Sequence, residues 1–325
     1  MNILMSGSGS GGHINPCISL YKYLSSYYKI YIVIFKKIDK KIYDMNNISY
    51  YYIDDKLSVK DKIIMIKKFM NNQKIGKTLT FGGKNSFYIN LVAKMLKKKI
   101  YIFEQNVILG KANKINYLLC NKIFTNFIIN LKKEINVGNP NTFNLKPNKV
   151  KLFNNNKKTL LFTMGSLGSS TIDKVIVNFI KTNKDYNVIY VLGNNVNNRL
   201  SNKDNLIVFD YYNPLTDLIN YADIIISRAG ASTLSEIIYF NKPSIIIPSP
   251  YVTDDHQSKN ALAIKKENGC IVIKEKELSV DLLNYKIHLL ANNKKYYKNM
   301  KKNLLKLDKG NNFSKIKDVL MNDNI

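Results

Sequence analysis

The sequence predicts an α/β protein with two doubly wound parallel-sheet domains that face one another across a cleft. Short continuous apolar runs alternate with amphipathic stretches from end to end, a pattern typical of buried parallel strands covered by helices on both faces. Two of these runs lead directly into loops rich in glycine and serine, at residues 6–12 and 165–170. Ligands of doubly wound sheets bind outside the carboxyl ends of the strands, so these loops are the first candidates for a site.

The length and composition fit two ordinary domains. The chain has 325 residues and is 45% hydrophobic, enough for packed cores. Its cysteines, Cys17, Cys120 and Cys270, lie far apart without a Cys-x-x-Cys pair, so we expect a reducing cytosol and no disulfide framework. No apolar run reaches the roughly 18 residues of a bilayer-spanning helix, and the amino terminus lacks a signal-peptide layout. We therefore expect a soluble or peripheral protein.

The formal net charge of +27 has two interpretations. It could mark a surface for nucleic acid or anionic lipid. It could also follow from a coding bias that enriches Lys, Asn, Ile and Tyr together, and the even spread of lysines favours this second interpretation. A nucleic-acid-binding protein would gather its basic residues on one surface with interleaved aromatics, whereas the glycine loops are poor in basic side chains. We expect contact with an anionic membrane surface and none with nucleic acid.

The first half of the chain, residues 1–145, is predicted to form the first domain. A short apolar strand precedes the first glycine loop, and further strands are predicted at residues 29–35, 99–103 and 122–127. Amphipathic helices are predicted at residues 59–70 and 87–98. The pattern stops at residues 138–158, where two prolines and an Asn-Lys cluster indicate a linker.

The second domain, residues 146–325, is predicted to repeat this plan. A strand from residue 159 enters the second glycine loop, and a helix follows from about Thr171. Further strands are predicted at residues 187–192, 205–209, 223–227, 244–247 and 270–273. The lysine-rich stretch 282–307 has helical spacing, and we expect the last helix to pack back onto the first domain.

The first glycine loop reads "SGSGSGGHINP" and precedes a predicted helix, with Asn15 as its cap and Pro16 at its first position. His13 lies at the junction, where it can reach a substrate and accept a proton or simply bond its neighbours. The Gly-x-Gly-x-x-Gly spacing matches the dinucleotide fingerprint, but the second strand ends in Phe35-Lys36-Lys37 and not in an acidic residue. An NADP enzyme and a ligand-free turn remain alternatives.

The stretch "IIISRAGASTLSEI" (224–237) is the most informative in the sequence. A buried strand ends at Ser227, the chain turns, and a helix is predicted to begin near Ser232 or Thr233. The N–H groups and dipole of that helix form an anion site. Thr233-x-x-Glu236 also fits a capping box, while a carboxylate facing the cleft would accept the hydroxyls of a ribose. The sequence leaves both roles of Glu236 open.

A polar segment at residues 245–261 follows another predicted strand. Its side chains could ligate a metal, but their spacing matches no closed metal site, and prolines beside a strand end typically shape a binding loop. We therefore expect amide and hydroxyl recognition, with no metal and no cofactor. The polar residues concerned are Asp254, Asp255, His256, Gln257 and Asn260.

Taken together, the loops resemble those of the MurG family, peripheral glycosyltransferases that move N-acetylglucosamine from its UDP donor to lipid I. The resemblance covers nearly the whole chain and rests on separated motifs in the same order: "GSGSGGHINP" (7–16), "FEQNVILGKANK" (103–114), "VGNPNT" (137–142), "MGSLGSS" (164–170), "SRAGASTLSE" (227–236) and "PSPYVTDDHQSKNA" (248–261). It implies the GT-B fold, with the acceptor bound mainly by the first Rossmann-like domain and the nucleotide sugar mainly by the second.

The resemblance also implies site residues. From the first domain, the donor would be contacted by Ser10, Gly11, Gly12 and Asn106. From the second, it would be contacted by Ser166, Tyr212, Arg228, Ala231, Ser232, Thr233, Leu234, Ser235, Glu236 and Gln257. Glu236 would hold the ribose, Gln257 the sugar, and Tyr212 would act through its backbone near uracil. Two departures affect this expectation: Thr142 replaces an arginine that assists donor binding, and Lys84 replaces a common tyrosine near the acceptor.

The implied reaction is an inverting transfer to the C4 hydroxyl of the N-acetylmuramic acid in undecaprenyl-pyrophosphoryl-MurNAc-pentapeptide (lipid I), giving lipid II for peptidoglycan. Backbone dipoles would stabilise the departing diphosphate without a mandatory metal. His13 is the candidate base, with Glu104 as the second choice. We expect the protein at the cytoplasmic face of the inner membrane. A related GT-B transferase with another lipid acceptor remains the alternative.

Overall fold

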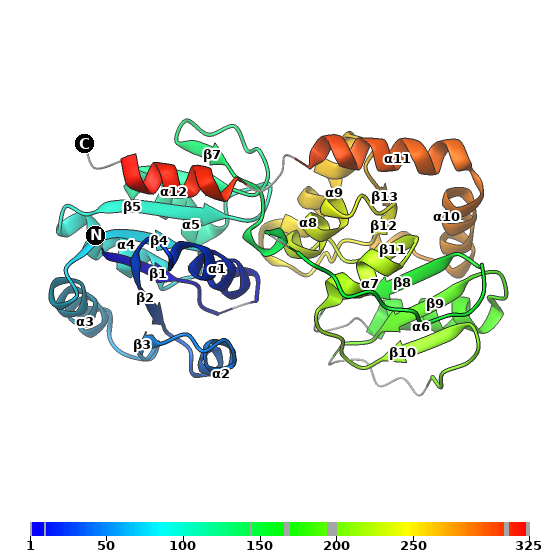
Figure 1. The fold of residues 1–325 in the computed structure, drawn as a ribbon, viewed down its shortest axis with the longest axis horizontal. Helices are drawn as coiled ribbons and strands as arrows, with labels where there is room; N and C mark the ends of the chain where they lie inside the picture. The colour runs from blue at the N-terminus through cyan, green and yellow to red at the C-terminus, as the bar shows by residue number, and fades with distance from the viewer. Residues whose placement is uncertain are drawn as a thin grey trace. The chain divides into compact units, whose positions relative to one another are not determined.

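The computed structural model describes residues 2–9, 11–143, 145–165, 170–193, 200–308 and 312–322. The chain forms two compact units, Met1–Phe143 with Gly310–Ile325, and Asn144–Lys309 (Figure 1). The sequence assigned residues 146–325 to the second domain with the last helix returning to the first. In the structure the segment from residue 310 onward groups with the first unit.

The first unit contains a seven-stranded sheet in the order β3-β2-β1-β4-β5-β6-β7, with every neighbouring pair parallel. The order reverses between β1 and β4, so the loops after these two strands leave the same point of the sheet. The strands are β1 (Asn2–Ser6), β2 (Lys29–Ile34), β3 (Tyr50–Tyr52), β4 (Ile75–Thr80), β5 (Lys99–Glu104), β6 (Lys122–Thr125) and β7 (Glu134–Asn136).

Helices cover both faces of this sheet. One apolar core lies under α1 (Gly11–Leu24), α2 (Lys37–Met45) and α12 (Phe313–Asn322). The other lies under α3 (Val59–Asn72) and α4 (Ser86–Met95), with α5 (Lys111–Leu119) packed beside α4. The short η1 (Pro140–Thr142) contacts α1. Two covered faces explain why strands such as β2 and β5 are continuously apolar.

The second unit repeats the plan with six parallel strands in the order β10-β9-β8-β11-β12-β13. Here the order reverses between β8 and β11. The strands are β8 (Thr159–Thr163), β9 (Asn187–Val191), β10 (Leu206–Phe209), β11 (Ile224–Ser227), β12 (Ser244–Ile246) and β13 (Ile271–Val272). The fold class predicted from the sequence, two parallel-sheet α/β domains, is confirmed.

The helices of the second unit are α6 (Ser170–Thr182), α7 (Leu215–Tyr221), α8 (Ala231–Tyr239), α9 (His256–Lys266), α10 (Val280–Asn292) and α11 (Lys294–Leu307), with η2 (Thr253–Asp255) and η3 (Glu275–Glu277). The helical stretch predicted at 282–307 is divided between α10 and α11. Asn293 separates them with φ −86° and ψ 90°, and its side chain accepts a hydrogen bond from Tyr296 N, which caps α11.

One prediction about the first loop is wrong. Pro16 was expected at the first position of a helix capped by Asn15, but α1 begins at Gly11 and Pro16 lies inside it. The two glycines before His13 adopt helical conformation, so the helix starts five residues earlier. Because proline has no N–H, the Gly12 carbonyl receives no main-chain bond from the residue four positions later.

The last helix is held to the first unit by apolar packing and by a buried lysine. Phe313, Ile316 and Leu320 lie in the core under α1, and Phe313 stacks on Phe143 with ring centroids 4.1 Å apart. Lys77 of β4 is buried, and its ammonium donates to the Leu320 carbonyl near the end of α12. A cation near a helix C-terminus is stabilised by the negative end of the helix dipole.

Within the described ranges, no helix combines the length and apolar character that crossing a membrane requires.

We predict that Phe313→Ala lowers the free energy of unfolding of the first unit by about 3–5 kcal/mol, because it removes a fully buried ring. The measurement is urea unfolding of the protein, monitored through amide hydrogen exchange in the strands of the first sheet. Met321→Ala on the same helix, where the side chain is exposed, should change stability by less than about 0.5 kcal/mol. Equal effects of the two substitutions would contradict the packing described for α12.

Candidate active site

The loop after β1 passes so close to α1 that it has no room for a side chain at Gly7. A Cβ there would lie 2.4 Å from the His13 carbonyl oxygen and 2.6 Å from Cys17 Cβ. Such distances are far below van der Waals contact, so glycine is required at this position. The loop is thereby pressed against the first turn of α1, where His13 is the third helical residue.

The loop after β4 meets the same histidine from the other side. Phe81 N donates to Ser6 O over 3.0 Å, which joins the two strand ends. Gly82 and Gly83 follow with φ values of +88° and +83°. A Cβ on Gly82 would lie 3.1 Å from His13 Nε2, and one on Gly83 would lie 3.1 Å from Ser8 O. The paired glycines allow the second loop to approach both His13 and the first loop.

These loops line a cavity of about 410 Å³ at the switch point between β1 and β4. His13 contributes to its wall together with two exposed lysines, Lys36 after β2 and Lys84 after β4. The exposed Asp55 is the acidic residue in the lining. Main-chain groups, an imidazole and two ammonium groups therefore share one concave surface, which suits an anionic ligand with a hydroxyl to be deprotonated.

Glu104, at the end of β5, is buried and bonded through both carboxylate oxygens. Its Oε1 accepts from the main-chain nitrogens of Gln105 and Asn106, each over 3.0 Å, and from Asn106 Nδ2 over 3.1 Å. Its Oε2 accepts from Gly110 N and Asn113 Nδ2, each over 2.9 Å. Five donors around one carboxylate leave little capacity for taking a substrate proton. This geometry favours a role for Glu104 in shaping the loop that carries Asn106.

The other first-unit positions that the sequence singled out are Gly11, Gly12, Ser10 and Thr142. Gly11 and Gly12 form the first turn of α1 and are exposed. Ser10 lies outside the described residues. Thr142, at the position of the expected arginine, is buried in η1, where its hydroxyl donates to the Asn139 carbonyl over 3.0 Å. Thr142 is thus bonded within its own turn.

In the second unit, α8 begins directly after β11 at the other switch point. The cap is Gly230, and Leu234 N is the donor to the Gly230 carbonyl over 2.9 Å. The N–H groups of Ala231, Ser232 and Thr233 precede this first intrahelical bond and point along the positive end of the dipole. The side chain of Leu234 is buried, and the Ser235 hydroxyl donates back to Ala231 O over 2.8 Å. A ligand would therefore meet mainly the main chain of this turn.

The start of α8 excludes one of the two roles that the sequence left open for Glu236. A capping box would need Thr233 before the first helical residue, but Thr233 is the third residue of α8 and the cap makes no side-chain hydrogen bond. The capping box is therefore excluded. Burial raises the pKa of the Glu236 carboxyl to about 8, because the charged form is poorly solvated there. Hydroxyl groups donating to this carboxylate would relieve that penalty.

Arg228, in the turn before α8, has its guanidinium directed into the unit. Nη1 lies 2.7 Å from Glu275 Oε2 and donates to the Ile247 carbonyl over 3.2 Å, and both partners of the ion pair are largely buried. Asn260 of α9, also buried, donates to the Ala229 carbonyl over 3.2 Å. These bonds fix the turn that presents the first N–H groups of α8.

The other second-unit residues predicted from the sequence are Gln257, Tyr212 and Ser166. Gln257, on α9, accepts from Ser249 N over 2.9 Å and so orders the loop after β12. Tyr212 is half-buried against Phe209, with ring centroids 4.9 Å apart. Ser166 lies outside the described residues. Among the residues that the structure describes, no group of three or more His, Cys, Asp or Glu side chains is placed to hold a metal ion.

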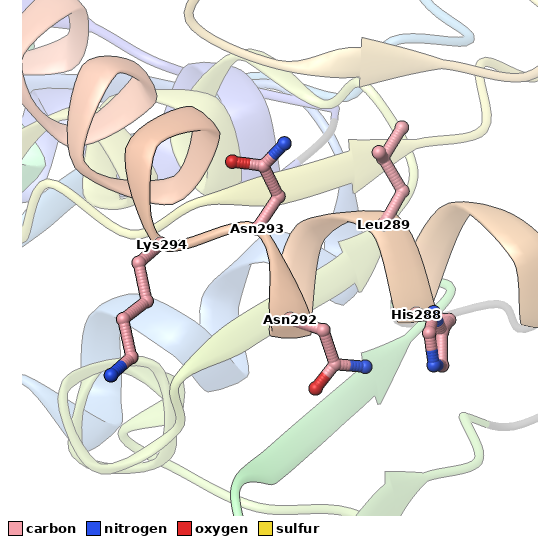
Figure 2. A pocket seen from close by; sticks show the side chains of 5 residues that line it. All are labelled: His288, Leu289, Asn292, Asn293 and Lys294. Atoms are coloured by element: carbon pink, nitrogen blue, oxygen red, sulfur yellow. The ribbon is translucent and has the colours of Figure 1, made fainter.

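A separate shallow hollow of about 560 Å³ lies where α10 meets α11 (Figure 2). Its described lining residues all belong to the end of α10, the start of α11 and the residue between them. The residues are His288, Leu289, Asn292, Asn293 and Lys294. Four of the five are exposed, as expected for a solvated helix junction, so this hollow is not part of the candidate site.

Sequence reasoning missed two buried polar residues of the first unit. Asn113 was noticed only as part of a motif, yet its amide donates to both Glu104 and the Phe103 carbonyl over 2.9 and 3.0 Å. Asp39 lies in α2, a helix that was not predicted, and contacts the first glycine loop. An isolated acidic or amide residue in a polar stretch carries no signal of burial, so only the fold reveals these contacts.

Comparison with known proteins identifies the two Rossmann-like units as the two domains of a glycosyltransferase. Residues 3–125 match the N-terminal domain of glycosyltransferase family 28, and residues 159–320 match its C-terminal domain. The chain belongs to the MurG family of UDP-N-acetylglucosamine–N-acetylmuramyl-(pentapeptide) pyrophosphoryl-undecaprenol N-acetylglucosamine transferases.

Individual relatives span nearly the whole chain. The transferase of Caldicellulosiruptor saccharolyticus is 30% identical over 95% of this chain and 94% of its own length. That of Bacillus pumilus is 30% identical, with 90% and 91% covered. The crystal structure of Acinetobacter baumannii MurG superposes with a TM-score of 0.81 at 20% identity and covers 99% of each chain. This last likeness supports the fold.

The raised pKa of Glu236 gives a stability prediction with a defined sign. Between about pH 4.5 and 8 the carboxyl is protonated in the folded protein and ionised in the unfolded chain, so stability falls as pH rises through this window. Glu236→Gln removes that loss. We expect the variant to be more stable than the wild type by about 1–3 kcal/mol at pH 7, with the difference vanishing near pH 4.5.

The measurement is urea unfolding of both proteins from pH 4 to 9. The matched control is Glu267→Gln, since Glu267 is exposed at the end of α9. A stability difference for Glu236→Gln that does not change with pH would contradict the raised pKa of this carboxyl.

Proposed function

We propose that this protein transfers N-acetylglucosamine from UDP-N-acetylglucosamine to the C4 hydroxyl of N-acetylmuramic acid in lipid I, forming lipid II. The observation that carries the proposal is the start of α8 at the β8/β11 switch point, where three main-chain N–H groups lie in the first helical turn and Glu236 lies in the second. Family membership supports the same activity, because the relatives are named for this transfer.

The second unit supplies the donor site in this proposal. The diphosphate lies against the first turn of α8, where N–H groups and the helix dipole favour negative charge. Glu236 is not engaged in a capping box, and in this proposal it accepts hydrogen bonds from the ribose hydroxyls. Gln257 contacts the sugar. As the sugar leaves, negative charge grows on the UDP diphosphate. Fixed N–H dipoles stabilise that charge without reorganising.

The first unit supplies the acceptor site and the base. The acceptor carries its own diphosphate, which fits the cavity beside Lys36 and Lys84 and the glycine loops. His13 takes the proton from the C4 hydroxyl as the oxygen forms its bond to the anomeric carbon. The bond from that carbon to the UDP oxygen breaks on the opposite face, and UDP departs with the electron pair. The configuration of the sugar is inverted.

The direct test is incubation of the purified chain with UDP-N-acetylglucosamine and lipid I, with the lipid product identified by mass spectrometry. The expected product carries one additional N-acetylhexosamine. Transfer to another polyprenyl-diphosphate sugar, with none to lipid I, would favour the related transferase with a different acceptor. Absence of transfer to any such lipid would contradict the proposal.

We predict that His13→Ala lowers kcat by about 10²- to 10⁴-fold, the usual contribution of a positioned general base. The KM for UDP-N-acetylglucosamine should change by less than about threefold, because His13 acts on the acceptor hydroxyl and the donor is held by the second unit. Steady-state kinetics with lipid I measure both values. His288→Ala, on the exposed surface of α10, is the matched control. Undiminished turnover in His13→Ala would remove His13 from the role of base.

We further propose that the first unit contacts the cytoplasmic face of the bacterial inner membrane, where a lipid-linked acceptor is located. The neighbouring helices α3, α4 and α5 expose large apolar side chains among lysines. Leu118 is 77% exposed, and Ile64, Met95 and Ile115 are each more than half exposed. Apolar side chains with flanking cations suit an anionic lipid surface, where each lysine contributes about 1 kcal/mol.

We predict that Leu118→Glu weakens binding to phosphatidylglycerol vesicles by at least about tenfold, because it removes an apolar contact of roughly 1.5–3 kcal/mol and adds negative charge. Vesicle sedimentation at fixed salt measures the partition coefficient. Leu305→Glu, at an exposed position of α11, is the matched control for the charge change. Equal loss of binding in both variants would assign the effect to net charge alone and contradict a docking role for α5.

A further inference from the structure

One face of α2 is bonded to the first glycine loop at three consecutive residues. Asp39, in the first turn of α2, is buried, and its Oδ2 accepts from Gly9 N over 3.1 Å and from the Ser8 hydroxyl. Tyr43 lies one helical turn further on, and its hydroxyl donates to Gly7 O over 2.7 Å. Residues four apart share a helix face, so Asp39 and Tyr43 act on the loop together.

The contacts made by Ser8 extend this arrangement to the end of β2. Ser8 Oγ accepts from Phe35 N over 3.3 Å while its hydroxyl donates to Asp39. Gly9 adopts φ +99°, a conformation that few other residues hold, so its N–H needs a fixed partner to stay in place. The buried carboxylate is itself stabilised by the N-terminus of α2, where negative charge is favoured.

The first glycine loop forms part of the cavity wall and contacts both α1 and the loop after β4. Gly7 is pressed against the His13 carbonyl, and the Ser8 carbonyl faces Gly83 of the second loop. Ser8, Gly9 and His13 all line the 410 Å³ cavity, whereas Asp39 does not. A displacement of Ser8 or Gly9 would therefore change the surface on which the acceptor lies and the first turn that carries His13.

We propose that Asp39 is a positioning residue for the transfer reaction, holding the first glycine loop in the shape that aligns acceptor and His13. The effect on catalysis rests on the proposed function, whereas the hydrogen bonds of Asp39 to Ser8 and Gly9 do not. In a dinucleotide-binding protein an acidic residue after the second strand accepts ribose hydroxyls. Here the acidic residue after β2 accepts hydrogen bonds from the protein's own loop.

The test compares four full-length proteins: wild type, Asp39→Ala, Asp39→Asn and the matched control Asp44→Asn. Asp44 lies on the exposed side of the same helix. Two properties are measured for each: amide hydrogen exchange in a peptide covering residues 7–12, and kcat together with the dissociation constant for UDP. Hydrogen exchange reports the clamp without relying on turnover, and UDP binding reports whether the second unit is intact.

We expect Asp39→Ala to raise the exchange rate in residues 7–12 and to lower kcat, each by at least about tenfold, while the dissociation constant for UDP changes by less than about twofold. Asp39→Asn should recover most of kcat, because its amide oxygen can take the place of Oδ2. Asp44→Asn should match the wild type. If Asp39→Ala does not fold, Ser8→Ala removes one of the two donors and should show the same changes at smaller amplitude.

An unchanged amide exchange rate in residues 7–12 of Asp39→Ala would contradict the claim that Asp39 holds the first glycine loop in place. Faster exchange with wild-type kcat would overturn the positioning role, and so would a kcat loss that Asp39→Asn does not recover. Failure of the proposed function looks different, because the wild type would then transfer no sugar to lipid I while the exchange measurement still decides whether Asp39 holds the loop.

Discussion

The close approach of bare main chain to the start of α1, at the point where the first sheet reverses its strand order, is the constraint on which the cavity of the first unit depends. It requires the absence of side chains at defined positions, as the 2.4 Å separation at Gly7 and the positive φ of Gly82 and Gly83 make clear. In return, N–H groups that helices cannot satisfy internally become available to an anionic ligand. In the second unit α8 also starts directly after its strand, with Gly230 as its cap, but a Cβ at Gly230 would have room, since its nearest neighbour is Thr233 Oγ1 at 4.0 Å.

Loops of this kind are ordered by buried polar side chains that lie beneath them. Glu104 gathers five donors from the segment around Asn106, Arg228 joins the turn before α8 to Glu275, and Asp39 holds Ser8 and Gly9. Each of these groups would be costly to bury without partners, and each has them. Glu104, Arg228 and Asp39 thus hold the loops in place.

The sequence predicted most strands because two-sided burial makes them continuously apolar, as at residues 29–35 and 187–192. It missed β4, where Lys77 interrupts the apolar run, since the partner that permits burial of this lysine comes from α12, more than 240 residues later. It missed α2, whose many lysines leave little apolar signal. The start of α1 was misplaced because Gly11 and Gly12, weak helix formers, are helical under the constraints of the fold. The sequence singled out Glu104 and Glu236 through their motifs. Only the structure shows that Glu104 accepts five hydrogen bonds from the segment that follows it and that Glu236 takes no part in a capping box.

The central claim is that main-chain nitrogens at the start of α8 bind the nucleotide diphosphate. Calorimetric titration of the purified chain with UDP and with uridine, both in excess EDTA, tests it most directly. The account predicts that UDP binds under these conditions and that uridine binds at least about tenfold more weakly, since an anion at a helix N-terminus contributes roughly 1 kcal/mol or more. Equal affinities for the two ligands, or UDP binding that appears only after a divalent cation is restored, would contradict it.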